Sequence, residues 1–342
     1  MAIKIGVGLF TGQIPAGSER TFQQEYRDYL TLVQLAEEEG LDSAWVSEHH
    51  GSDDGYLPSL LPMLAAFAAV TQRIELGTGV VLAPFHDPLR IAEDFAVVDQ
   101  ISGGRTIAGF GIGWRDEEFR MWNLDVSSRV RRLTELVEVV RLAWTTDRFS
   151  YSGKHFDYSD VAITPKPARV PPIFVGGFVD SAIKRAGRLG DGYLSSRAQP
   201  ERVAEAFRMA AEERSAAGRE GPPMVGILQN AFVTNDPDGD WPMVRDGIGH
   251  QLGVYAGWRA GTDVPGKPLE VAPPSEEDIR RTTAYGTPEQ VVEYLQPIAA
   301  VLAEYPESHL VLRLHYPGMS VEPAAEAVRL LARSVAPALR HL

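Results

Sequence analysis

The sequence predicts an α/β protein, with residues 1–342 folding as a single closed (β/α)8 barrel, a TIM barrel. Two observations favour this fold class. Eight short runs of β-branched or aromatic residues recur along the chain, and most are separated by a segment with helical periodicity. Alternation of strand and helix repeated eight times is typical of a closed parallel barrel. An open doubly wound sheet is the competing topology.

The expected strands are short and bounded by glycine, proline or polar residues. Several are apolar almost throughout, as strands covered on both faces are. In chain order they are Ile3–Phe10, Ser43–His49, Ile74–Leu82, Thr106–Gly113, Pro172–Phe178, Gly192–Ser196, Val225–Thr234 and Leu310–Tyr316.

The helix expected after the third strand has clear signals at both ends. Asp87–Pro88 supplies an N-cap followed by proline at the first helical position, and Gly103–Gly104 ends the helix. The apolar residues between these signals are spaced to form one stripe: Ile91, Phe95, Val98 and Ile101.

Two gaps between strands are too long for a single helix, so insertions are expected after strand four and strand seven. Residues Phe149–Phe156 in the first gap are expected to form an inserted hairpin. The second gap spans residues 235–287. Within it, Thr262–Pro274 is rich in glycine and proline and poor in large apolar residues, which predicts a mobile lid over the site. Tyr255, Trp258 and Arg259 in the same gap suit either an amphipathic helix or substrate contacts.

Composition excludes several functional classes. The chain has 33 Lys and Arg against 46 Asp and Glu, a formal net charge of −13, which disfavours nucleic acid and anionic membranes as partners. Cysteine is absent, so disulfides and thiolate chemistry are excluded. No targeting segment is visible and the longest apolar run, Leu60–Val70, is too short to span a bilayer, so a cytoplasmic protein is expected.

Polar residues gather where the expected strands end, which is where barrels carry their active sites. Four of the eight histidines fall there and predict a functional pocket: His49, His50, His86 and His315. The residues expected to line a substrate pocket are Phe10, Glu48, His50, Tyr56, Phe85, His315 and Tyr316.

Glycines mark two of these strand ends. Gly109, Gly111 and Gly113 do not form the dinucleotide-binding pattern, so they indicate either a flat ligand lying against the strand or close packing. Gly176–Gly177 leads into a helix beginning near Ser181, where free backbone N–H groups could hold an anion.

Taken together, these motifs resemble the bacterial luciferase-like, flavin-dependent monooxygenase family. The similarity extends from the first expected strand to the last helix. Its most specific pieces are Ser47–His50, Leu76–Val81, Asp99–Arg105, Pro172–Gly177, Arg188–Gly192 and Gly286–Glu289.

The resemblance implies a flavin at the C-terminal mouth of the barrel and a homodimer. Reduced FMN, supplied by a separate flavin reductase, would react with O₂ and then oxidise a small organic substrate. By position, His49 matches the family's acid/base histidine, and Gly79 and Val80 match a pair under the flavin ring that is often joined by a cis peptide. The residues matching the flavin-phosphate site are Gly176, Gly177, Phe178, Val179 and Ser181.

The sequence departs from the family pattern at the phosphate site. Trp114 stands where luciferase has an arginine, and Arg115 follows one position later, so either Arg115 takes over or flavin affinity is modest. Asp180 beside the phosphate loop would tend to repel a phosphate. Gly111–Trp114 followed by Glu117–Phe119 also occurs in relatives that use the 8-hydroxy-5-deazaflavin coenzyme. Hydride transfer with that coenzyme, without O₂, is therefore the alternative function.

Two further hypotheses lie outside this chemistry. A metal-dependent hydrolase could draw ligands from Glu48, His49, His50, His86 and His315. Against it, the usual metal motifs are missing, and adjacent residues on a strand face opposite sides, so His49 and His50 are not expected to share an ion. No metal site is therefore predicted. A barrel that binds flavin or another ligand without catalysis is the second hypothesis.

Overall fold

Eight parallel strands close into a barrel in the computed structural model, which describes residues 3–196, 198–263 and 274–340. Their order around the barrel is β10, β12, β1, β2, β3, β5, β8 and β9, and pairing of β9 with β10 closes it. This arrangement confirms the predicted fold class. The eight strands are β1 (Lys4–Phe10), β2 (Ser43–Val46), β3 (Glu75–Thr78), β5 (Thr106–Gly111), β8 (Ile173–Gly176), β9 (Gly192–Ser195), β10 (Met224–Val233) and β12 (Ser308–Arg313).

Alternating side chains along the strands build two separate apolar layers. One set meets inside the barrel and comes from five strands: Trp45, Ile107, Phe174, Leu194 and Val311. Residues one position along, such as Val46 and Ala108, belong to the larger core between the barrel and its helices. The strands are therefore apolar on both faces, as the near-continuous apolar runs predicted.

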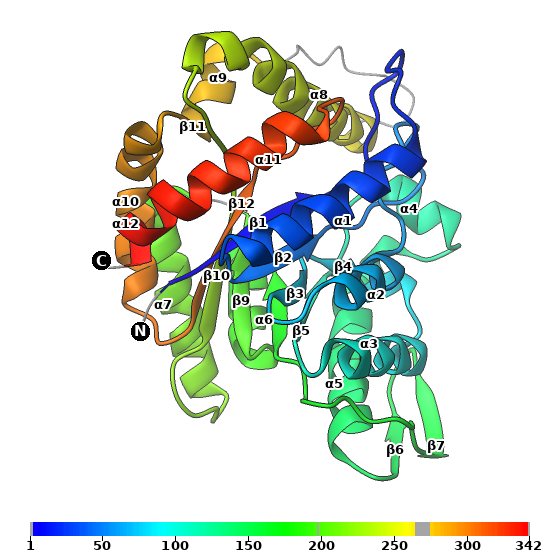
Figure 1. Ribbon diagram of the computed structural model, residues 1–342. Coiled ribbons are helices and arrows are strands. Elements are labelled where there is room, and N and C mark those ends of the chain that lie inside the picture. Colours follow the sequence, from blue (N-terminus) through cyan, green and yellow to red (C-terminus); the bar gives the residue numbers. More distant parts are fainter. Residues whose placement is uncertain (1–2, 197, 264–273, 341–342) are drawn as a thin grey trace.

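Helices surround the barrel on its outside, and Figure 1 shows α1 and α11 side by side across one face. The main outer helices are α1 (Phe22–Glu38), α2 (Leu60–Val70), α3 (Pro88–Ser102), α5 (Arg129–Thr145), α6 (Asp180–Leu189), α7 (Pro200–Ala216), α10 (Pro288–Ala303) and α11 (Val321–Leu330). The last described elements are a π-helical turn, Leu331–Val335, and helix α12 (Ala336–Arg340). None of the helices in the described ranges is long and apolar enough to cross a membrane.

Helix α3 begins and ends where the sequence predicts. The Asp87 side chain accepts hydrogen bonds from the backbone N–H groups of Leu89 and Arg90, and Gly103 ends the helix with a φ of 70°. The predicted apolar stripe is wrong at one position. Ile91, Phe95 and Val98 are buried, whereas Ile101 is 50% exposed because it lies on the solvent side of the last turn.

Both predicted insertions are present. Strands β6 (Phe149–Ser152) and β7 (Asp157–Val161) form the expected antiparallel hairpin. Residues 235–287 contain a long helix, α8 (Pro237–Asp263), a short one, α9 (Glu276–Arg281), and strand β11 (Thr283–Gly286), which pairs with β10. Most of the predicted lid, Thr262–Pro274, lies outside the described residues.

Six of the eight predicted strands end one to three residues earlier than predicted. The largest differences are in β2, which ends at Val46 rather than His49, and in β12, which ends at Arg313 rather than Tyr316. The predicted third strand, Ile74–Leu82, is divided into β3 and the short β4 (Val81–Leu82). The N–H of Ser47 still donates to the carbonyl of Phe10 in β1. The backbone then leaves the sheet, because the N–H of His49 donates to the carbonyl of Leu57 and that of His50 donates to the Glu118 carboxylate. The motif Ser47–His50 is therefore a loop, and strand alternation does not set the directions of its side chains.

Glycines at the strand ends make room for neighbouring strands. A Cβ atom at Gly109 would lie 2.0 Å from the Thr78 carbonyl oxygen, and one at Gly111 would lie 2.5 Å from a methyl group of Val80. Close packing thus requires both glycines. The peptide between Gly79 and Val80 is cis, as expected, and a second cis peptide joins Gly8 to Leu9, a strand position that the sequence did not single out.

One prediction concerns His309, which is fully buried inside the barrel between Trp45 and Phe174, at ring distances of 5.7 and 5.8 Å. Neither ring nitrogen has a partner among the described residues, and burial, with a smaller effect of Lys4, lowers its pKa to about 3. As pH falls below about 6.5, His309 binds a proton in the unfolded chain but stays neutral in the folded chain. The free energy of unfolding therefore decreases as pH falls from about 6.5 to about 3.

His309→Leu should therefore leave the free energy of unfolding unchanged or higher at pH 8 and make it fall less steeply between pH 8 and pH 5 than in the wild type. Urea unfolding at several pH values measures this slope. His155→Leu, on the β6–β7 hairpin, is the control. Equal slopes in the wild type and the His309 variant would contradict the prediction.

Candidate active site

His49 lies in the loop after β2 and is 5% exposed. Its Nδ1 atom lies 2.8 Å from Oε1 of Glu118, which is completely buried. Glu118 belongs to α4 (Asp116–Met121), a short helix in the loop that follows β5. The loops after β2 and β5, two strands that lie on either side of β3, thus bring an imidazole and a carboxylate together. A carboxylate in this arrangement orients a histidine for proton transfer.

The Glu118 carboxylate makes further contacts besides its hydrogen bond with the His49 imidazole. Its Oε1 atom also accepts the backbone N–H of His50 at 2.9 Å, while Oε2 has no hydrogen-bond partner among the described residues. The Arg115 guanidinium lies 3.9 Å from Oε1 and donates to the carbonyl oxygen of His50 at 2.7 Å. These contacts fix the loop that carries His49 against α4.

Aromatic rings surround the His49 imidazole. The ring centroids of Tyr56, Trp114, Tyr255 and Trp258 lie 4.9, 6.2, 5.5 and 4.7 Å from its own. Tyr255 and Trp258 come from α8, so the insertion after strand seven covers the histidine. The sequence left two interpretations of these residues open, and the structure places them against His49.

Polar contacts also hold α8 over the strand ends. The hydroxyl oxygens of Tyr56 and Tyr255 are 3.1 Å apart, and Arg115 stacks on Trp258 at 4.2 Å from the ring centroid. Asp54 accepts a hydrogen bond from Nε2 of His250 on α8 at 2.9 Å. Three separate contacts therefore attach this helix to the loops after β2 and β5.

A second prediction tests this attachment. Burial would raise the pKa of Asp54, but hydrogen bonds from His250, Ser52 and Gln13 lower it below its usual value of 3.8. The ionised carboxylate therefore stabilises the fold above pH 3.8, and this contribution is lost as pH falls below that value. Asp54→Asn should cost about 2 kcal/mol of unfolding free energy at pH 7. Urea unfolding should show that this loss becomes smaller below pH 4, about the ordinary pKa of aspartate. A loss that stays the same below about pH 4 would show that the ionised carboxylate of Asp54 is not what stabilises the fold.

A second polar cluster flanks His49. Oε1 of Glu48 lies 2.5 Å from Nε2 of His50 and 2.9 Å from Nε2 of His86. Burial would raise the pKa of Glu48, but the two imidazoles lower it to about 2, and Glu48 in turn raises the pKa of His86 against the effect of burial. The cluster is a buried carboxylate held between two histidines.

With this geometry established, comparison with known proteins identifies the family. The family model for luciferase-like monooxygenases matches residues 3–304. The chain belongs to the luciferase-like monooxygenase family. This confirms the resemblance predicted from the sequence motifs.

Individual relatives of this luciferase-like protein have names that state different activities. It is 29% identical over 336 residues to an F420-dependent glucose-6-phosphate dehydrogenase of Microbacterium testaceum, an alignment covering 95% of this chain and 96% of that enzyme. A similar enzyme of Amycolatopsis mediterranei is 34% identical over 176 residues, covering 49% of this chain but only 53% of the enzyme. The crystal structure of monooxygenase RslO1 from Streptomyces bottropensis has a TM-score of 0.84 and 25% identity, covering 98% of this chain and 99% of that one.

The structure brings some predicted pocket residues together and leaves others apart. Glu48, His50, Tyr56 and Phe85 lie in the loops around His49. Three other predicted pocket residues make their described contacts elsewhere: Phe10 packs on Tyr29 and Phe67 in the outer core, His315 contacts Glu25 and the Met319 carbonyl, and the Tyr316 hydroxyl donates to Ala231 and Arg313 carbonyls.

The positions of Phe10 and His315 explain why these two residues differ from the others. Phe10 points toward the outer helices, because alternate residues of a strand face outward. His315 is buried in the loop after β12, where burial and nearby Arg20 and Arg313 lower its pKa to about 3, so that it is neutral near pH 7. A position at a strand end does not by itself direct a side chain into the mouth.

The predicted phosphate site lies between β8 and α6. A Cβ atom at Gly177 would lie 2.5 Å from Cβ of Ala182, so glycine is needed for the chain to turn into the helix. Phe178 and Val179 are 46% and 52% exposed. Asp180 forms an ion pair with Arg202 at 3.3 Å. The positive charge of Arg202 offsets the repulsion between Asp180 and a phosphate that the sequence predicted.

Arg115 does not join this loop in its described contacts, because it is buried against His50, Glu118 and Trp258. The suggestion that Arg115 replaces the missing phosphate arginine therefore gains no support from the structure. Arg185 on α6 is a buried cation that no sequence motif indicated. It is 9% exposed, and its Nη1 has no partner among the described residues.

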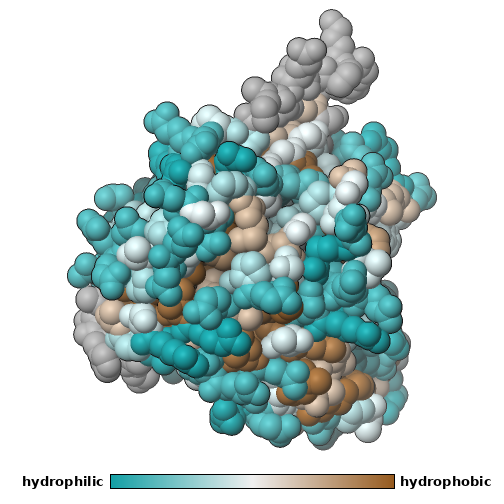
Figure 2. Space-filling model, turned by 45° about the horizontal axis from the view of Figure 1, so that its top comes forward, coloured by the Kyte–Doolittle hydropathy of each residue, from teal (hydrophilic) through white to brown (hydrophobic). Residues whose placement is uncertain are grey.

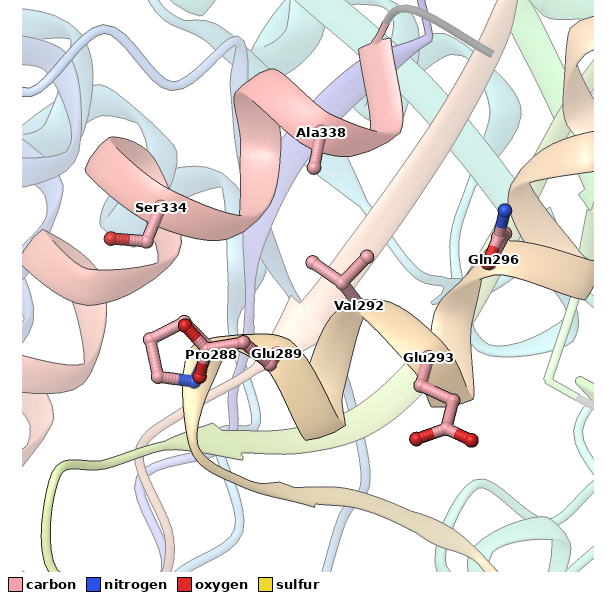
Figure 3. Close-up of a pocket in the computed structure, with 7 residues that line it drawn as sticks. All are labelled: Pro288, Glu289, Val292, Glu293, Gln296, Ser334 and Ala338. Carbon is pink, nitrogen blue, oxygen red and sulfur yellow. The ribbon is translucent and has the colours of Figure 1, made fainter.

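A groove of about 410 Å³ lies on the outside of the barrel, away from the strand-end loops that carry His49. Figure 3 shows its walls, formed by α10 on one side and by the π-helical turn and α12 on the other. Its lining residues are Pro288, Glu289, Val292, Glu293, Gln296, Ser334 and Ala338. None of them is among the predicted site residues.

Proposed function

We propose that this luciferase-like protein is an oxidoreductase that uses the deazaflavin coenzyme F420 to transfer a hydride to or from a small organic substrate. The observation that carries the proposal is its similarity, over 95% of the chain, to an F420-dependent glucose-6-phosphate dehydrogenase. The buried His49–Glu118 pair supplies a proton-transfer group that such a reaction needs. The sequence pattern at Gly111–Trp114 and Glu117–Phe119 favours the same coenzyme.

Three features of the structure fit a coenzyme of this kind. Glycines at 111 and 176 let the Val80 side chain pack between them, because added Cβ atoms would lie 2.5 and 3.0 Å from its methyl groups. Val80 is the residue that the family resemblance assigns to the position under the ring. Phe178 and Val179 expose apolar side chains that a flat ring system could cover. Arg185 has a buried N–H group without a described partner, which an anionic group could satisfy.

The residues of this chain have defined tasks in the proposed reaction. When bound, the coenzyme accepts or donates the hydride. His49 would remove the proton from a substrate hydroxyl or return it to a carbonyl, because imidazole exchanges protons near neutral pH. Glu118 would hold the Nδ1 side of the ring so that Nε2 faces the substrate. The rings of Tyr56, Trp114, Tyr255 and Trp258 would exclude water around this proton transfer.

A second candidate is a monooxygenase that uses reduced FMN and O₂, with a flavin reductase as the FMN donor. The specific observation favouring it is the TM-score of 0.84 to monooxygenase RslO1 over nearly the whole of both chains. In that case His49 would serve the same kind of proton transfer.

Binding distinguishes the two candidates without knowledge of the substrate. Separate titrations of the protein with F420 and with FMN, followed by fluorescence quenching, should show tighter binding of F420. Anaerobic reduction of F420 should then be tested with glucose 6-phosphate and with simple secondary alcohols. Tight FMN binding without F420 binding, or product formation only with reduced FMN and O₂, would overturn the proposal in favour of the second candidate.

We also propose that the protein forms a homodimer. Val97 and Ile101 on α3 are 47% and 50% exposed. Val170 is 44% exposed and follows Arg169, whose backbone N–H donates to Asp99 of α3. Figure 2 shows apolar side chains gathered at the lower right of the molecule, the side on which Figure 1 places α2 and α3. Light scattering should give twice the chain mass, and Ile101→Glu should shift the mass toward the monomer; a monomer in the wild type would refute the proposal.

A further inference from the structure

We propose that Glu48, His50 and His86 form a binding site for one divalent transition-metal ion of the zinc class. Each residue offers one ligand atom, and the three atoms lie within 4.8 Å of one another. The sequence motifs predicted no metal site, and the proposed coenzyme chemistry does not use this set as one. The inference is independent of the proposed coenzyme.

The types of ligand determine which ions can bind. Two imidazole nitrogens and one carboxylate oxygen suit Zn²⁺, Co²⁺ or Fe²⁺, and this combination leaves coordination positions open for water. Mg²⁺ and Ca²⁺ prefer sets made almost entirely of oxygen atoms, and the cluster offers them a single carboxylate. The site should therefore discriminate strongly between the two kinds of cation.

Surrounding contacts hold the ligands in place, as outer-shell groups do in metal sites. The second oxygen of Glu48 accepts the backbone N–H of Leu82 at 3.1 Å. The His50 ring packs against Phe85 and Trp122 at ring distances of 5.8 and 4.4 Å. His50 therefore has little freedom to turn its Nε2 atom away from Glu48.

Exposure and charge provide a route for the ion. Glu48 and His50 are buried, whereas the His86 side chain is 28% exposed and forms the solvent side of the cluster. Asp94 lies close enough to His86 to act on its charge. A cation would enter past His86 and take the place of the protons that now join the imidazoles to the carboxylate, so binding should release protons.

The location of the site suggests what the ion would do. Glu48 and His50 are the two neighbours of His49, and His86 follows the 3-10 turn Ala83–Phe85 after β4 (Val81–Leu82). A bound ion would join the two loops and fix the backbone on both sides of His49. Its effect would be to position the loop that carries His49.

Cobalt titration of the full chain, stripped with a chelator and kept free of coenzyme, tests the proposal. One equivalent of Co²⁺ should bind and produce visible d–d absorption, Zn²⁺ should abolish that absorption, and a large excess of Mg²⁺ should not. Glu48→Gln and His86→Ala should each weaken binding at least about 100-fold. His155→Ala, at a histidine of the β6–β7 hairpin, is the control.

Circular dichroism checks the folding of each variant. Where a variant misfolds, NMR of the wild type serves instead, because Zn²⁺ should shift the imidazole signals of His50 and His86 and leave that of His155 unchanged. Absence of saturable Co²⁺ binding, or binding of equal strength in folded His86→Ala, would overturn the metal site. Neither result would affect the proposed coenzyme, whose binding is measured separately.

Discussion

Replacing His49 by asparagine is expected to lower turnover by about 10²–10⁴-fold and to leave coenzyme affinity nearly unchanged. Asparagine keeps part of the hydrogen bonding of His49 to Glu118 but cannot exchange a proton near neutral pH. The loss should appear in kcat, because proton transfer occurs in the transition state. Steady-state kinetics together with coenzyme titration measure the two effects separately.

The alternative to a catalytic His49 is a buried histidine with a purely structural hydrogen bond. Under that interpretation, His49→Asn would lower the free energy of unfolding and retain most of the activity. His155→Asn, at a half-buried histidine on the β6–β7 hairpin, is the matched control and should keep full activity. The assignment of His49 fails if the variant remains active, or if activity is instead lost only on replacing His50.

The fold was predictable because each of its signals is local. Short apolar runs specify strands covered on both faces, and Asp87–Pro88 and Gly103 mark the two ends of α3. Strand ends were less predictable, because tertiary contacts decide where the sheet stops. β2 ends at Val46 once the N–H groups of His49 and His50 find acceptors outside the sheet, at Leu57 and Glu118.

Of the candidate site, the sequence predicted His49 but not its contacts with Glu118 and α8. The motif Ser47–His50 and its position at a strand end indicated His49. Glu118, 69 residues away in sequence, reaches His49 only because α4 packs across the loop after β2. Its sequence signal was its place in Glu117–Phe119, which follows the glycine-rich strand end and includes two of the three acidic residues that begin α4. Trp258 of α8 was equally hidden, since nothing local shows that an insertion helix covers a particular strand end.

Glu118→Gln is expected to lower turnover by about 10²-fold, since it removes the charge that stabilises a protonated His49 while keeping the size of the side chain. The glutamine amide has two possible orientations beside Nδ1 of His49. In one of them its NH₂ group donates to Nδ1, so the proton of the neutral His49 ring must lie on Nε2 instead. The pH at which turnover is half-maximal should move as well, because an opposite charge beside the imidazole is lost. Glu118 would thus act as a positioning residue, through His49.

The pH–rate profile separates this role from a purely structural one, because general loss of stability would lower activity without moving the profile. Glu117→Gln, on the same helix, is the matched control, since Glu117 pairs with Arg120 at 2.9 Å, lies 3.8 Å from the Arg115 guanidinium and makes no described contact with His49. Glu118→Asp retains the charge and should recover part of the activity or restore the wild-type profile. An unshifted profile in folded Glu118→Gln, or equal losses in the two glutamine variants, would show that the carboxylate of Glu118 does not assist His49.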